Sequence, residues 1–143
     1  MTDLTALFTD LIRAETLLFN LIDARVRAAH DMSLGTLEFL RIMERRGRCR
    51  VYDIAHEVHI TIGATSKAVD RIEARGWCRR EANPGDRRSS LLVLTDEGRA
   101  ALTAAVPTFE EAMTAYASGL PAPVLDQLAS GLAQWRERLE EQP

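Results

Sequence analysis

The stretch that decides the fold runs from Asn83 to Gly98, NPGDRRSSLLVLTDEG. It opens on an Asn-Pro-Gly turn, sets Arg87 and Arg88 side by side soon after it, and continues as an apolar run. Two short extended segments, residues 77–81 and 90–94, flank this turn, a pattern that is typical of a β-hairpin. Since no core uses a pair of arginines on a turn, we interpret both as groups that leave the protein surface.

Directly before the hairpin, the apolar spacing predicts two short helices joined by a tight turn. The first covers residues 51–58, the turn lies at His59-Ile60, and the second begins at a Thr61 cap and runs to about Arg75. A helix-turn-helix followed by a hairpin is the winged-helix arrangement. Within the second helix, three apolar residues are expected to be buried: Ile62, Val69 and Ile72.

Longer helices are predicted on both sides of this unit. An apolar stripe at three- and four-residue steps marks a helix over residues 4–26, and Ser33 can cap another that ends at Gly47. After the hairpin, a helix begins at Thr95 and is expected to kink at Pro107, and a last amphipathic helix follows residues 121–123. The sequence therefore predicts one domain of 143 residues, mainly α with a small β-hairpin wing.

The net charge of -3 hides an uneven distribution. Residues 41–88 hold twelve basic and seven acidic side chains, a net charge of +5, so the rest of the chain carries -8. Proteins that bind nucleic acids concentrate positive charge on one face, because release of condensed counterions supplies most of the affinity that is independent of sequence. The basic centre indicates such a surface, with a solvated arginine-rich face as the alternative.

The composition and the missing motifs exclude several classes of protein. At 46% hydrophobic and 27% charged residues, the chain is typical of a folded domain. No apolar run approaches the ~18 residues of a membrane span, and the first ten residues lack the layout of a secretory signal, so we expect a cytoplasmic protein with no membrane partner. Without a Gly-rich phosphate loop, an HExxH pattern or a nucleophile elbow, we expect neither an enzyme nor a cofactor.

Residues 51–98, VYDIAHEVHITIGATSKAVDRIEARGWCRREANPGDRRSSLLVLTDEG, now support a family name. This segment resembles the DNA-binding part of MarR-type regulators, the multiple-antibiotic-resistance family, above all in VDRIEARG, NPGDRR and VLTDEG. The resemblance implies a homodimeric transcription regulator that binds a pseudo-palindromic operator in double-stranded DNA. It also implies a winged helix-turn-helix lobe over residues 33–100 and dimerisation helices from both chain ends, over residues 1–32 and 107–143.

The same resemblance implies that the helix from Thr61 to Arg75 is a recognition helix that enters the major groove. Short side chains allow a close approach to base edges, and Lys67 and Arg71, one turn apart, can reach phosphates on the same side. Two positions depart from the family pattern: His59 lies where Gly is common, and Thr65 where a more apolar residue is common. The predicted outward-facing contacts are Thr61, Gly63, Ala64, Thr65, Ser66, Lys67 and Arg71.

In the wing, Asp86-Arg87-Arg88 resembles the family's Asp-x-Arg pattern. The resemblance implies that Arg88 reaches the minor groove and that Asp86 orients it, with Arg87 as a phosphate contact. Guanidinium groups suit a narrow minor groove because its negative potential is deepest there. The alternative is an exposed turn with a local ion pair between Asp86 and Arg88, worth ~0 to 1 kcal/mol.

Many relatives bind a small aromatic or phenolic anion between the dimerisation helices and the winged lobe, and then lose operator affinity. The resemblance therefore implies a repressor that a small molecule releases. Four residues are candidates for binding such an effector, with ordinary surface roles as the alternative: Arg13, Arg25, His30 and Arg41.

The two cysteines raise the possibility of a redox sensor. Cys49 lies between two arginines and Cys78 precedes two more, surroundings that favour a thiolate, although small buried apolar roles are the simpler interpretation. His56 and His59 have a spacing at which imidazoles can bind zinc, but we expect no metal site because His59 lies at the turn. The rival from another class is a winged-helix module that docks a protein partner.

Overall fold

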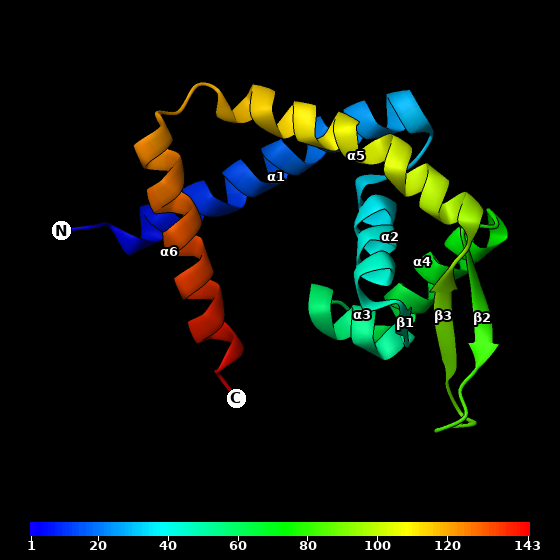
Figure 1. Ribbon diagram of the computed structural model, residues 1–143. Helices are drawn as coiled ribbons and strands as arrows, with labels where there is room; N and C mark the ends of the chain where they lie inside the picture. The colour runs from blue at the N-terminus through cyan, green and yellow to red at the C-terminus, as the bar shows by residue number, and fades with distance from the viewer. The chain divides into compact units, whose positions relative to one another are not determined.

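The computed structural model describes residues 1–143. It contains six helices and three short strands (Figure 1), and it confirms the predicted class, mainly α with a small hairpin wing. The elements are α1 (Leu4–His30), α2 (Leu34–Arg46), β1 (Arg48–Cys49), α3 (Val51–Val58), α4 (Ile62–Ala74), β2 (Cys78–Ala82), β3 (Ser90–Leu94), α5 (Asp96–Ala117) and α6 (Ala122–Glu140).

Side-chain oxygens cap the helix beginnings where the sequence places cap residues. Ser33 accepts from the backbone N–H of Thr36 at the start of α2, and Thr61 accepts from that of Ala64 at the start of α4. Each cap satisfies one backbone donor that has no partner within its helix. The N-terminal end of α2 is also held by α1, because the Asp23 carboxylate accepts from Leu34 N–H at 2.7 Å.

The sheet is antiparallel with the strand order β1-β3-β2. The hairpin register pairs Cys78 with Leu94 and Ala82 with Ser90, so the turn sequence connects the strands beyond the Ala82–Ser90 pair. Residues 48–49, between α2 and α3, pair with β3, where Cys49 lies opposite Leu92, and so form a third strand. In Figure 1 the hairpin projects from the group formed by α2, α3 and α4. We call α2, α3, α4 and the sheet the winged lobe.

The core of the winged lobe is built from the apolar faces of its helices and the inward side of β3. Val69 and Ile72 of α4 are buried as predicted, whereas the expectation for Ile62 is wrong, since its side chain is 57% exposed. Ile62 is the first residue of α4. The largest fully buried side chains of the lobe are Leu37, Leu40, Met43, Ile54, Thr65, Val69, Ile72 and Leu92, and Val26 of α1 is also fully buried.

A close backbone contact sets the direction in which α5 leaves the wing. The Thr95 N–H donates to the Trp77 carbonyl at 3.0 Å, and the Thr95 hydroxyl accepts from Gly98 N–H at 3.0 Å. Gly98 is buried here, and a Cβ atom added to it would overlap the Trp77 carbonyl. The glycine of the VLTDEG motif therefore permits this contact.

The chain separates into two compact units, residues 1–109 and 110–143. In the first unit, α1 buries only Ile22 and Val26 and leaves apolar residues such as Phe8 and Leu17 exposed. In the second, α6 buries no residue, and its apolar stripe is exposed. No helix is both long and apolar enough to span a membrane. The exposed stripe of α6 consists of Val124, Leu128, Leu132, Trp135 and Leu139.

Candidate nucleic-acid interface

The turn before α4 has the tight geometry of a helix-turn-helix. His59 ends α3 in the left-handed conformation, with φ of 56° and ψ of 41°. The Ile60 N–H then donates back to the Ala55 carbonyl at 3.1 Å, and Thr61 caps α4 two residues after His59. A left-handed histidine is uncommon, so this position carries a modest conformational cost that glycine would avoid.

Most of the residues predicted to face outward on α4 are exposed. These are Thr61, Gly63, Ala64, Lys67 and Arg71, and Ser66 is half-buried. The prediction that Thr65 faces outward is wrong: it is fully buried, and its hydroxyl donates to the Thr61 carbonyl at 2.9 Å. Thr65 lies in phase with Val69 and Ile72, so it belongs to the inner face of the helix.

The tip of the wing is held by its own polar side chains. Asn83 accepts from Gly85 N–H at 3.1 Å and donates to the Ser89 hydroxyl at 3.0 Å. Asp86 accepts from the backbone N–H of Arg88 at 2.9 Å. The carboxylate therefore fixes the Arg88 backbone and makes no ion pair with its guanidinium, so the alternative of a local ion pair is not realised.

The basic residues of the winged lobe divide sharply by their partners. Between Arg41 and Arg88, eight of the twelve cations make an ion pair with a carboxylate within 4.0 Å. The other four have exposed side chains and no carboxylate partner. Positive charge that is already paired is largely neutralised, so the charge available to an anionic ligand lies on these four residues: Lys67, Arg71, Arg87 and Arg88.

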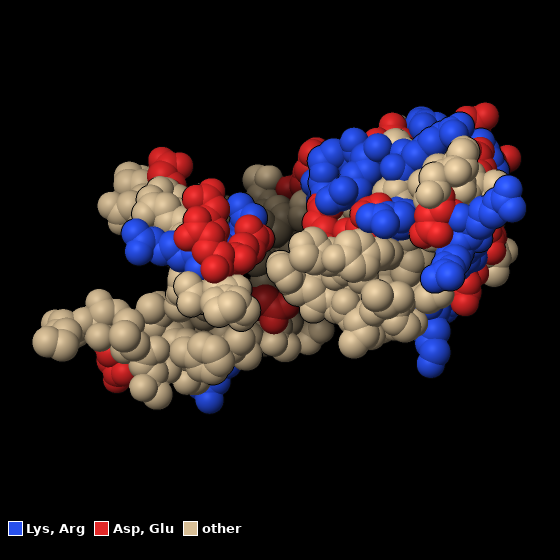
Figure 2. All heavy atoms as spheres, turned by 90° about the horizontal axis from the view of Figure 1, so that it is seen from below, with Lys and Arg blue, Asp and Glu red and all other residues tan.

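Figure 2 shows how the charges are distributed over the face that carries α3 and the wing. Lys and Arg side chains gather over the winged lobe there, with acidic side chains between them. Two of the four unpaired cations belong to the predicted recognition helix and two to the wing tip. The surface that is free to meet phosphate groups therefore coincides with the two elements that a winged helix presents to DNA.

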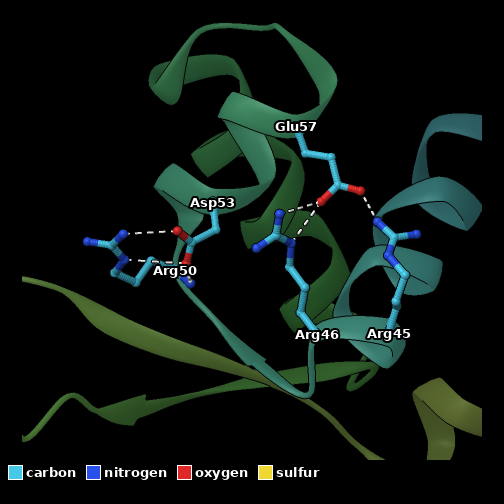
Figure 3. A network of polar contacts seen from close by, with 5 residues as sticks. All are labelled: Arg45, Arg46, Arg50, Asp53 and Glu57. Carbon is cyan, nitrogen blue, oxygen red and sulfur yellow. Dashed lines mark hydrogen bonds and ion pairs between the residues drawn. The ribbon is translucent and has the colours of Figure 1, made fainter. Parts of the chain in front are cut away.

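Paired arginines at the beginning of α3 form a separate network (Figure 3). The Arg50 guanidinium lies 2.9 Å from Asp53, whose carboxylate also accepts from the Arg50 backbone N–H at 2.7 Å. Glu57 receives both Arg45 and Arg46, the latter at 2.7 Å. The hydrogen bond from the Arg50 side chain lowers the pKa of Asp53, so this carboxylate stays ionised. The network fixes α3 against the end of α2.

Arg80 joins the wing to α4. Its guanidinium lies 2.7 Å from Asp70 and 2.7 Å from Glu73, and its backbone N–H donates to Glu73 at 3.2 Å. The sequence prediction missed this residue, although an arginine on the strand directly after the helix gives a weak indication of it. Arg75 also connects separate parts of the chain: its guanidinium lies 3.8 Å from the centroid of the Trp77 ring and donates to the Asp31 carbonyl.

The four effector candidates do not come together in one chain. His30 shares a hydrogen bond with the Thr108 hydroxyl at 2.8 Å, and Arg41 lies 4.8 Å over the ring of the next residue, Phe109. These two therefore meet adjacent residues of α5. Arg13 is exposed on α1, about 25 Å along the helix from His30 at ~1.5 Å per residue, and Arg25 is also exposed.

The cysteines do not have the surroundings that a reactive thiol requires. Both are reduced and buried, which confirms the simpler interpretation. Burial raises the pKa of Cys49, and the neighbouring Asp53 adds to the shift. Burial also raises the pKa of Cys78 to about 11. The expectation of a favoured thiolate is therefore wrong, because burial outweighs the lowering effect of Arg46 on the pKa of Cys49 and of Arg80 on that of Cys78.

His56 and His59 lie close together at the end of α3, with ring centroids 6.4 Å apart and the rings tilted by 47°. Tyr52 stacks on His56 at 5.8 Å. No group of three or more His, Cys, Asp or Glu side chains in the chain could hold a metal ion.

Comparison with known proteins gives one consistent result. The family model described as "MarR family" matches residues 32–90. Over 62 residues the chain is 39% identical to YwhA of Bacillus subtilis (strain 168), an uncharacterised HTH-type transcriptional regulator, and this match covers 43% of the chain and 45% of YwhA. The chain thus spans less than half the length of the first curated relatives that it matches.

Similarity to solved structures extends over nearly the whole chain. The structure of Sco3205, a MarR family transcriptional regulator from Streptomyces coelicolor in complex with DNA, matches with a TM-score of 0.86 and 29% identity, covering 97% of this chain and 88% of Sco3205. BpsR of Bordetella bronchiseptica, whose DNA binding is regulated by 6-hydroxynicotinic acid, matches with a TM-score of 0.83. At 21% identity, with 92% of this chain and 98% of BpsR covered, that likeness shows the fold alone.

Proposed function

We propose that this chain, whose residues 32–90 match the MarR family model, is a MarR-type DNA-binding transcription regulator. In this proposal it acts as a homodimer that binds a pseudo-palindromic operator in double-stranded DNA. The single observation that carries this function is the distribution of unpaired cations. Lys67 and Arg71 on α4, and Arg87 and Arg88 on the wing, have no carboxylate partner, while every other basic residue from Arg41 to Arg88 has one.

In this proposal α4 enters the major groove, and the wing follows the adjacent minor groove. Thr61, Gly63, Ala64 and Ser66 allow a close approach to base edges, while Lys67 and Arg71 bind phosphates. Thr65 is left out of the contact set because it is buried. Arg88 enters the minor groove from a backbone that Asp86 holds, and Arg87 contacts a phosphate.

Dimerisation is supported by the apolar stripes on α1 and α6. Single surface leucines are ordinary, but exposed apolar residues repeating along whole helices mark a surface that another chain covers. The symmetric dimer would place two winged lobes on the two half-sites of an inverted repeat. Sedimentation measurements at micromolar concentration test this directly, with a mass of twice 16.0 kDa expected; a monomer bound to DNA would contradict it.

We further propose that the protein is a repressor that a small aromatic or phenolic ligand releases from the operator. Ligand binding would favour a spacing of the lobes that does not fit successive major grooves. His30 and Arg41 are the candidate effector residues that meet adjacent α5 positions, so we assign the ligand contacts to them before Arg13 and Arg25. The first compound to test for operator release is 6-hydroxynicotinic acid, with Arg13→Ala as the control for His30→Ala.

The DNA-binding function is tested by a mobility-shift assay with fragments flanking the protein's own gene. We expect at least one fragment to shift at nanomolar to micromolar protein and the shift to weaken as salt rises, because phosphate contacts release counterions. Equal binding to all fragments, or none, would contradict the proposal.

A further inference from the structure

The exposed large apolar side chains of this chain form three groups. Two lie toward the chain ends, on α1 and on α6 with Leu120 before it, and the proposed dimer covers them. The third lies in the helix-turn-helix, far along the sequence from both. It consists of Tyr52, Ile60 and Ile62, which are 51%, 44% and 57% exposed. Neither the core nor the dimer accounts for this group.

These three side chains line one open pocket of about 230 Å³, together with Ala55, His56 and His59. Tyr52 and His56 stack with an angle of 9° between their rings, which makes one wall of the pocket flat and rigid. Ile60 and Ile62 lie on either side of Thr61, the residue that caps α4. The pocket therefore opens beside the first turn of α4, the part of a recognition helix whose residues contact base edges.

The isoleucine side of the pocket selects among the four bases. In the major groove, bases present hydrogen-bond donors and acceptors, and only thymine adds an apolar group, its C5 methyl. Isoleucine side chains can neither donate nor accept a hydrogen bond, so polar base edges would lose their water against them without compensation. A methyl group placed against the isoleucines would instead be favourable, because the contact removes apolar surface of both groups from water.

We propose that this pocket reads a thymine in each half-site, with Ile62 as the principal contact to the C5 methyl and Ile60 beside it. This role rests on the proposed DNA-binding function and adds a specificity-determining residue to it. It places Ile62, which the sequence pattern assigns to the core, at the protein surface that distinguishes one base from the others.

Replacement of thymine by deoxyuridine tests this assignment, because it removes one methyl group and leaves every hydrogen bond intact. A duplex obtained by binding-site selection with the wild-type protein is remade with deoxyuridine at each thymine in turn. Dissociation constants are then measured by fluorescence anisotropy. Burial of one methyl group is worth ~0.8 kcal/mol, so we expect about fourfold weaker binding at one thymine of each half-site.

The matched variants are Ile62→Ala and Lys67→Ala. Ile62→Ala should bind the thymine duplex several-fold more weakly and should lose the difference between thymine and deoxyuridine. Lys67→Ala should bind both duplexes more weakly and keep the difference. Since Ile62 is exposed, Ile62→Ala should keep the wild-type melting temperature, which a circular dichroism melt verifies.

Two results would overturn the assignment while leaving DNA binding intact. One is a selected duplex in which no thymine responds to deoxyuridine, and the other is an unchanged response in Ile62→Ala. A selection that enriches no sequence at all is a different failure, since it would remove the proposed function together with this role.

Discussion

The guanidinium of Arg80, in the wing, lies 2.7 Å from a carboxylate oxygen of Asp70 on α4. A second contact of 2.7 Å joins Arg80 to Glu73, one turn further along the same helix. Wing and predicted recognition helix are thereby held at one mutual angle. The arginine also neutralises two carboxylates on a helix that has to approach phosphates.

Replacement of Arg80 by alanine should therefore weaken operator binding by roughly five- to tenfold without any loss of a DNA contact. The stability loss should be small, ~1 kcal/mol or less, because both carboxylates are substantially exposed. Anisotropy and urea denaturation measure the two effects. Arg79→Ala is the control, since Arg79 pairs only with Glu81 of its own strand; equal effects of both variants would contradict the positioning role.

The two kinds of DNA contact should separate in their salt dependence. Lys67→Ala or Arg71→Ala removes one phosphate contact per chain, so in a dimer the slope of log K against log salt should fall by about 2. Arg88→Ala should instead cost about 1 to 3 kcal/mol and relax the base preference at the position the wing reaches. Titrations between 50 and 200 mM salt, on duplexes that vary at that position, distinguish the two; identical profiles would remove the groove assignment of Arg88.

Peroxide should not abolish operator binding, because neither thiol is available as a thiolate. With the pKa of Cys78 raised to about 11, its thiolate fraction at pH 8 is roughly one in a thousand. Alkylation by iodoacetamide should therefore be slow in the native protein and fast in urea. Loss of binding under peroxide that Cys49→Ser or Cys78→Ser prevents would restore the redox alternative.

Gly98→Ala should destabilise the protein far more than an ordinary glycine replacement in a helix. The added methyl group would overlap the Trp77 carbonyl, so either the beginning of α5 or the backbone directly before β2 has to move. We expect a loss of about 2 to 4 kcal/mol, against a gain of ~1 kcal/mol from alanine's helix propensity alone. Gly131→Ala in α6, where a Cβ atom meets nothing within 4 Å, is the control, and urea denaturation compares the two.

The Asp23 carboxyl group should make the free energy of unfolding depend on pH. Burial raises the pKa of its carboxyl group, but the Leu34 N–H and Arg27 together outweigh this, so the pKa is lowered. A lowered pKa means stability that is present above the unfolded value of ~4 and is lost as pH falls through the folded value. Asp23→Asn should thus be less stable than the wild type at pH 7, and the difference should shrink toward pH 3 in urea titrations. A constant difference would contradict this role.

Local signals were sufficient for the order of the elements. Ser33 and Thr61 act as caps, and the turn at residues 83–85 closes the hairpin, because each depends on neighbours within a few residues. The resemblance of residues 51–98 adds the winged-helix arrangement, and the family match agrees with it. The assignment of the end helices to dimerisation stays a prediction.

What the sequence does not contain is the choice of tertiary partners. The two residues of β1 become a strand only because β3 lies beside them. Thr65 is buried and Ile62 is exposed, the reverse of what the sequence predicts, because the contact of α4 with α3 decides which face of α4 turns inward. Likewise, twelve cations look alike in the sequence, and only the fold pairs eight of them with carboxylates and leaves four unpaired.

Those four cations test the central claim most directly. The measurement is the dissociation constant for the selected duplex and for a scrambled duplex, with the wild type and with a variant in which Lys67, Arg71, Arg87 and Arg88 are all alanine. Arg136→Ala with Arg138→Ala is the matched control on α6. We expect the wild type and the control to prefer the selected duplex by at least a hundredfold and the quadruple variant to lose that preference together with most of its affinity. Undiminished, sequence-dependent binding by the quadruple variant would contradict the account.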